Sequence, residues 1–183
     1  MPKMIKLKAA ALAAVIGFVS VWGVSAQAQM VDMNAFYGRF EGMGVAEDAE
    51  SIYFETTVRE LAVEIRPNGN GFQIYWSTQF RKGGDPNAPK QKLREATIDF
   101  VPTGQPGIYA SADRDPFGKP MWWAALRDQT LHTYMMQIDN QGRWIIQKYA
   151  RTLTGVGMEL MFERYRVGED VRTVKGRLNR VTY

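Results

Sequence analysis

Residues 59–81 read RELAVEIRPNGNGFQIYWSTQFR, and the fold can be argued outward from this stretch. In both halves apolar side chains alternate with polar ones: Leu61, Val63 and Ile65, then Phe72, Ile74 and Trp76. Because successive side chains of a β-strand point to opposite faces, this alternation predicts two strands that share one apolar face. The intervening residues 67–71, PNGNG, tolerate the positive φ that a tight turn requires. A hairpin cannot bury its apolar face alone, so further strands must join it.

The rest of the chain carries turn signals every 10–12 residues and almost no helical pattern. Loops are predicted at 83–89 and 113–120, and further strands at 35–45, 93–101, 107–112, 122–127, 130–138, 143–153, 158–167 and 171–182. This spacing is typical of an all-β protein, either a sandwich or an up-and-down antiparallel β-barrel of about ten strands. We favour the single barrel, since closure removes the exposed edges of an open sheet.

The first residues indicate export. Lys3, Lys6 and Lys8 precede an apolar run at 9–24, and small residues then offer cleavage after Ala26 or Ala28. The run is short for a membrane-spanning helix of about 20 residues. We therefore expect a signal peptide at 1–28, a single barrel domain at 29–183, and a periplasmic or secreted protein.

Charge and cysteine content exclude several classes of function. The chain has a net charge of +4, and residues 1–28 hold three lysines and no acidic residue, so the mature chain is left with +1. A nearly neutral domain gives no reason to expect nucleic-acid binding. The absence of cysteine excludes disulfides, thiol nucleophiles and thiolate metal sites.

Residues 38–44, GRFEGMG, resemble the first strand of the calycins, the group of lipocalins and fatty-acid-binding proteins, with Phe40 where that group usually has tryptophan. Calycins also pack a basic residue of the last strand on that ring, which implies that Arg177 or Arg180 does so here. The segments VEIRPNGNGF, DFVPTGQPGIY, ARTL and VKGRLNRV resemble a family of exported bacterial calycin-like proteins of unassigned function. The resemblance implies a β-barrel that encloses a small, largely apolar molecule.

The interior face is predicted from the strand alternation as Leu61, Val63, Ile65, Phe72, Ile74, Trp76, Ile98, Phe100, Leu160 and Phe162. These residues would build either a packed core or the wall of a ligand pocket. Arg164 and Arg166 share the parity of Leu160 and Phe162. An arginine there could bind a carboxylate or phosphate, or else reach water or pair with Glu95 or Asp99. We expect the ligand to contact Trp76, Tyr75, Trp122, Met136 and Arg164.

The residue pair Arg164-Tyr165 departs from the Arg-x-Tyr pattern of fatty-acid-binding proteins, because adjacent strand residues face opposite ways. The same rule allows only one of Trp122 and Trp123 to lie in the core. The other could cap the barrel mouth or bind a protein partner. An envelope interaction module acting through residues 113–123 is therefore the alternative function.

Haem, catalysis and membrane insertion are weaker alternatives. His132 is the only histidine, and a haem or metal site needs converging ligands, so we expect no cofactor. The sequence has no G-x-S-x-G or comparable signature, so we expect no enzyme. The terminal Tyr183 suits an outer-membrane barrel, but Arg177 and Lys175 would then face lipid at about 2–4 kcal/mol each. We expect no membrane-spanning segment once the signal peptide is removed.

Overall fold

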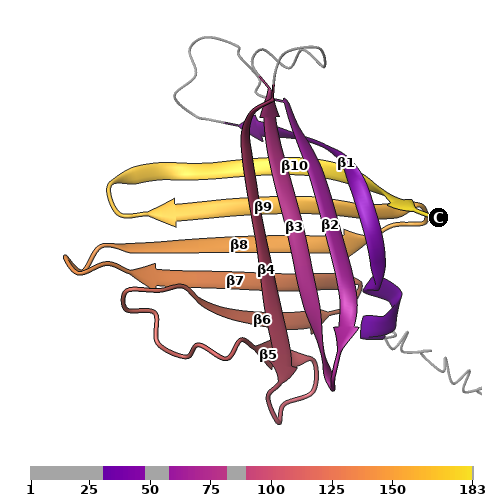
Figure 1. Cartoon of the computed structure of the whole chain (residues 1–183), viewed down its shortest axis with the longest axis horizontal. Helices are drawn as coiled ribbons and strands as arrows, with labels where there is room; N and C mark the ends of the chain where they lie inside the picture. The colour runs from indigo at the N-terminus through magenta and orange to yellow at the C-terminus, as the bar shows by residue number, and fades with distance from the viewer. Residues whose placement is uncertain (1–30, 48–57, 82–89, 183) are drawn as a thin grey trace, which may run out of the picture.

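The computed structural model describes residues 31–47, 58–81 and 90–182. In these ranges the chain forms a closed barrel of ten antiparallel strands, in which each strand pairs with its neighbours in sequence and β1 pairs with β10 (Figure 1). The strands are β1 (Gly38–Glu47), β2 (Val58–Asn68), β3 (Gly71–Arg81), β4 (Lys90–Pro102), β5 (Ile108–Ala110), β6 (Met121–Arg127), β7 (Thr130–Ile138), β8 (Trp144–Leu153), β9 (Gly157–Arg166) and β10 (Glu169–Val181). The predicted all-β up-and-down barrel is confirmed. The expected signal peptide and the loop at 83–89 lie outside the described residues.

The hairpin at 59–81 forms as the alternation predicts. Strands β2 and β3 pair with Val63 opposite Trp76 and Asn68 opposite Gly71. The connection is the two-residue turn Gly69-Asn70, in which Gly69 has φ +58°. The apolar residues of both strands point into the barrel.

One end of the barrel is filled by packed side chains. Phe36 of the short 3-10 helix η1 (Met33–Phe36) and Phe40 of β1 belong to one core cluster, and both rings are fully buried. Phe72 stacks on Phe100, with ring centroids 5.0 Å apart, and meets Tyr109 edge-on at 4.9 Å. Further buried members of this cluster include Ile65, Ile74, Leu126, Leu131, Met158 and Leu178. This end lies at the β2–β3 turn, opposite the ends of β1 and β4 that border the undescribed segments (Figure 1).

The basic residue that packs on Phe40 is Arg180. Its guanidinium carbon lies 4.5 Å from the centroid of the Phe40 ring. The same group donates hydrogen bonds to the carbonyl oxygens of Tyr37 at 2.5 Å and Ala35 at 2.6 Å. Arg177 instead lies on the outer face, where it pairs with Glu159 at 3.4 Å. The calycin resemblance left these two arginines open, and the structure selects Arg180.

Glycines allow the seam between β1 and β10 to close. Gly44 lies opposite Gly176, and a Cβ at either position would come within 2.7 Å or 2.6 Å of the Leu61 Cδ1 atom. A Cβ at Gly42 would overlap the carbonyl oxygen of Arg177. The first strand is rich in glycine because the Leu61 side chain and the backbone of β10 lie too close to it to leave room for a Cβ.

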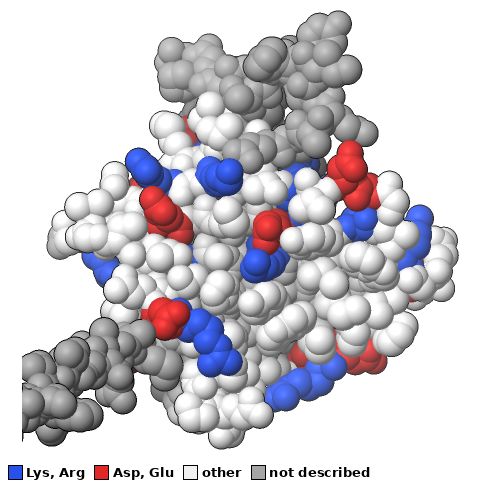
Figure 2. All heavy atoms as spheres, turned by 180° about the vertical axis from the view of Figure 1, so that it is seen from behind, with Lys and Arg blue, Asp and Glu red and all other residues white. Residues whose placement is uncertain are grey.

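Charges on the outer surface are mixed in sign. Figure 2 shows one face on which basic and acidic side chains are scattered rather than gathered into a patch of one sign. Several form exposed pairs, including Arg39 with Glu41 and Lys119 with Asp113. Within the described ranges, no helix is long and apolar enough to cross a membrane.

Candidate functional site

A cavity of about 310 Å³ lies inside the barrel, toward the end opposite the packed core. Its wall is built from strand ends that meet there, such as Arg59 at the start of β2, Phe80 at the end of β3 and Arg164 at the end of β9. This volume falls at the lower end of the range of about 300–1,000 Å³ for small-molecule sites. The barrel is thus filled at one end and hollow at the other.

Aromatic rings form one wall of the cavity. Trp76 meets Trp122 with ring centroids 5.2 Å apart and Tyr149 at 5.4 Å, and Tyr149 meets Phe162 at 4.8 Å. The buried indole Nε1 of Trp122 has no hydrogen-bond partner among the described residues. Such a wall offers apolar contact together with one unused donor.

Arg151 lies among these rings and is fully buried. Its Nη1 donates to the Thr133 hydroxyl at 2.8 Å, while Nε and Nη2 have no hydrogen-bond partner within the described part of the chain. The guanidinium carbon lies 5.0 Å from the Tyr149 ring centroid and 5.7 Å from that of Trp76. Burial lowers the pKa of Arg151 to about 10. The side chain is therefore held in place as a desolvated cation.

Tyr149 is the neutral partner in this group. Burial raises the pKa of its hydroxyl to about 12, so the phenol stays protonated at neutral pH. The hydroxyl donates to the side-chain oxygen of Gln147 at 2.8 Å. The ring thus presents its π-face to Arg151 while its polar end is satisfied.

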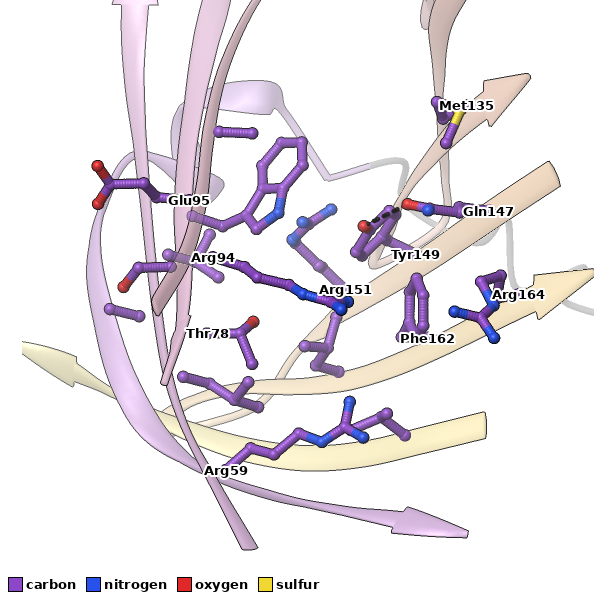
Figure 3. Close-up of a pocket in the computed structure, with 18 of the residues that line it drawn as sticks. Arg59, Thr78, Arg94, Glu95, Met135, Gln147, Tyr149, Arg151, Phe162 and Arg164 are labelled. Carbon is purple, nitrogen blue, oxygen red and sulfur yellow. Dashed lines mark hydrogen bonds between the residues drawn. The ribbon is translucent and has the colours of Figure 1, made fainter. Parts of the chain in front are cut away.

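Further arginines surround the cavity at different depths. Arg59 is 5% exposed and lies 4.7 Å from the Phe80 ring centroid. Arg94 is exposed and lies 5.4 Å from the same ring. Arg164 is partly buried and pairs with Glu169 at 3.0 Å. In Figure 3, Arg94 and Arg151 both lie in the middle of the cavity.

The lining of the cavity holds more basic than acidic side chains. Glu95 is the acidic member of the described lining residues. Its carboxylate points away from the other side chains (Figure 3) and accepts a hydrogen bond from the Tyr75 hydroxyl at 3.2 Å. The other predicted partner of Arg164, Asp99, accepts from Asn68 and Gln73 instead. Arginines therefore make up most of the charged side chains in the described lining.

Three of the five predicted contact residues line the cavity: Trp76, Trp122 and Arg164. Tyr75 and Met136 do not. Each is the sequence neighbour of a lining residue and faces the other way, so Trp76 and Met135 occupy the inner positions. Tyr75 and Met136 therefore lie outside the cavity lining, and ligand contact stays a prediction for Trp76, Trp122 and Arg164.

The sequence reasoning missed two polar residues of the cavity wall, Arg151 and Tyr149. Their inward position could have been inferred from the predicted turn between β8 and β9, because this turn fixes which residues of the two strands lie opposite each other. Leu153 pairs with Met158, which places Arg151 opposite Leu160 and Tyr149 opposite Phe162. Because opposite residues of an antiparallel pair share a face, the apolar parity of β9 extends to these two residues.

The remaining candidates lie outside the cavity. Trp122 is buried inside, whereas Trp123 stacks on Tyr134 at the outer surface, with centroids 5.2 Å apart. His132 belongs to the same outer stack, 6.2 Å from Tyr134, so it is not placed to hold a ligand inside the barrel. Among the described residues, no group of three or more His, Cys, Asp or Glu side chains could hold a metal ion.

Comparisons with known proteins add a likeness of fold. No protein-family model matches the chain, and no curated protein matches it. Among solved structures, it is similar to the S-type phycobiliprotein lyase CPES from Guillardia theta, with 8% sequence identity and a TM-score of 0.37. The match covers 85% of this chain and 96% of the lyase. Since similar barrels serve unrelated functions, this likeness carries no argument about what the chain binds.

Proposed function

We propose that this protein is an exported calycin-like barrel that binds a small amphipathic molecule in the cell envelope without transforming it. The observation that carries the proposal is the cavity of about 310 Å³ with its wall of Trp76, Trp122 and Phe162. A barrel that only needed to be stable would fill this space with side chains, as it does at the other end. Aromatic walls with a few polar groups are typical of small-molecule sites.

Export is proposed on the residues at the N-terminus. The lysines at 3, 6 and 8, the apolar run and the small residues before the mature chain have the composition of a signal peptide. Binding without chemistry is proposed because the polar groups of the cavity are mainly arginines and amides, which hold ligands more readily than they transfer protons at neutral pH.

Native mass spectrometry of the mature protein from its own periplasm tests the proposal. We expect a retained adduct of a few hundred daltons that is released on denaturation with its mass unchanged after prolonged incubation. A bare protein mass, together with no binding of small hydrophobic probes, would contradict ligand binding. A progressive change in the ligand's mass would instead indicate an enzyme. The N-terminal residue of the same sample tests cleavage after Ala26 or Ala28.

The alternative function is protein binding through residues 113–123, and two side chains of this segment are available for such contact. Phe117 of this loop is 64% exposed, and Trp123 lies on the outer surface, whereas Trp122 faces the cavity. A Phe117→Ala and Trp123→Ala double variant therefore tests partner binding without altering the cavity wall. Loss of a co-purifying partner with probe binding intact would favour the alternative.

A further inference from the structure

We infer that the ligand of this cavity is an organic anion whose carboxylate, phosphate or sulfonate group binds the Nε–Nη2 edge of Arg151. This inference rests on the proposed function and specifies the chemistry of its ligand. It concerns a fully buried arginine that belongs to the cavity lining and whose Nε and Nη2 atoms have no hydrogen-bond partner within the described residues.

The first argument is the missing counter-charge. Arg151 forms no ion pair with any described carboxylate, and Glu95 directs its own carboxylate toward Tyr75 outside. A buried charge is strongly unfavourable unless it is paired and hydrogen-bonded. The aromatic contacts with Tyr149 and Trp76 offset part of this cost but leave the Nε and Nη2 nitrogens without a hydrogen-bond partner among the described residues. An anionic ligand would supply both the charge and the acceptors.

The second argument is the shape of the free edge. Nη1 donates to the Thr133 hydroxyl, whereas Nε and Nη2 both lack a hydrogen-bond partner among the described residues. The Nε–H group and one Nη2–H group lie along one edge of the planar guanidinium and point in parallel, which is the geometry that binds two oxygens of one carboxylate or phosphate. Thr133, Tyr149 and Trp76 fix the plane, so little side-chain entropy would be lost on binding.

The third argument concerns the body of the ligand. The wall beside Arg151 consists of aromatic rings, and the cavity volume of about 310 Å³ suits a ring system of modest size rather than a long chain. Arg94, at an exposed position of the lining, adds positive charge that attracts anions. We therefore expect a flat or compact apolar body against Trp76 and Phe162, with its anionic group innermost.

Two fluorescent probes test the inference. 1-Anilinonaphthalene-8-sulfonate and N-phenyl-1-naphthylamine share their rings and differ by the sulfonate. We expect the wild-type protein to bind the sulfonate at least tenfold more tightly than the neutral probe. In Arg151→Met this preference should disappear, while the affinity for the neutral probe stays within about twofold. Arg177→Gln, which removes a cation on the outer face, should leave both affinities unchanged.

The outcomes separate the two proposals. If the wild type binds the neutral probe and shows no preference for the sulfonate, or if Arg151→Met keeps the preference, the anion inference fails and the binding barrel stands. If neither probe binds, the proposed function fails.

Should Arg151→Met not fold, Arg151→Lys keeps the positive charge without the two-pronged guanidinium. A sulfonate affinity unchanged in that variant would contradict bidentate binding. Displacement of the probe by 1-naphthoate or by 1-naphthyl phosphate distinguishes a carboxylate ligand from a phosphate ligand.

Discussion

Arg151 is a single residue whose burial lowers the stability of the folded barrel. Its pKa is lowered to about 10 because burial disfavours the cation. Below that pH the charged form is present in both folded and unfolded chains, so its desolvation cost is fully present at neutral pH and is relieved as the pH rises through 10. An empty cavity offers nothing that offsets this cost in full.

Replacing Arg151 by methionine should therefore not destabilise the empty protein. We expect Arg151→Met to raise the free energy of unfolding by about 1–3 kcal/mol, since an unpaired buried charge is exchanged for an apolar side chain of similar length. Urea unfolding followed by tryptophan fluorescence measures this change. A loss of stability in Arg151→Met would show that the arginine is a structural member of the core rather than part of a binding site.

We expect His132 to make the free energy of unfolding depend on pH in the weakly acidic range. Burial, followed by the charges of Lys148 and Arg127, lowers the pKa of this histidine below 6.5. Between the lowered pKa and 6.5 the unfolded chain binds more protons, so stability falls as the pH falls through this window. Glu163 pairs with Lys148 at 3.0 Å and so offsets part of the charge of that lysine.

In His132→Gln this contribution should be absent. We expect the decrease in melting temperature between pH 7.5 and pH 5.0 to be smaller in the variant than in the wild type. Thermal unfolding at both pH values measures it, and the comparison cancels the titration of carboxylates common to both proteins. Equal decreases in the two proteins would mean that His132 titrates normally in the fold.

Arg180 is a residue whose role is structural. It joins the last strand to the segment before β1 through two hydrogen bonds and the face of Phe40. We expect Arg180→Met to lower the free energy of unfolding by about 2 kcal/mol, since it removes two exposed hydrogen bonds that contribute about 1 kcal/mol each. Arg177→Gln is the matched control and should change it by less than about 0.5 kcal/mol. Equal effects of the two substitutions in urea unfolding would contradict the assigned role of Arg180.

At the scale of strands, alternation and turn residues were sufficient to predict the barrel. The hairpin at 59–81 and strand β7 (Thr130–Ile138) were obtained with correct bounds or nearly so. The inner face of β8 was not recognised, because its inward residues Gln147, Tyr149 and Arg151 are polar while Ile146 faces out. In β8 the polar residues face inward and an apolar residue faces outward, which reverses the usual alternation of a barrel strand. The inner face of β8 can therefore be recognised only from its pairing with β9.

The seam between β1 and β10 supplies a prediction about one strand. Gly42→Ala should lower the free energy of unfolding by about 1–3 kcal/mol, because the new Cβ would overlap the Arg177 carbonyl and force the two strands apart. Gly155→Ala is the control, since no atom lies within 4 Å of the position that its Cβ would take and its φ is not positive. Urea unfolding compares the two. A Gly42→Ala protein as stable as Gly155→Ala would show that the seam can shift without cost.

The whole molecule divides into a filled end and a hollow end, and two phenylalanines test this division. Phe100 is 1% exposed and stacks on Phe72 in the filled end, whereas Phe162 borders the cavity and is only partly buried. We expect Phe100→Ala to cost about 3–5 kcal/mol of unfolding free energy, the usual loss for a buried ring. Phe162→Ala should cost clearly less, because its ring already borders empty space, yet it should weaken probe binding by removing part of the wall.

Urea unfolding measures the change in stability, and a titration with N-phenyl-1-naphthylamine measures the change in probe binding. If Phe162→Ala were as destabilising as Phe100→Ala and left probe binding unchanged, the hollow end would be an extension of the core, and the barrel would have been built for stability at both ends.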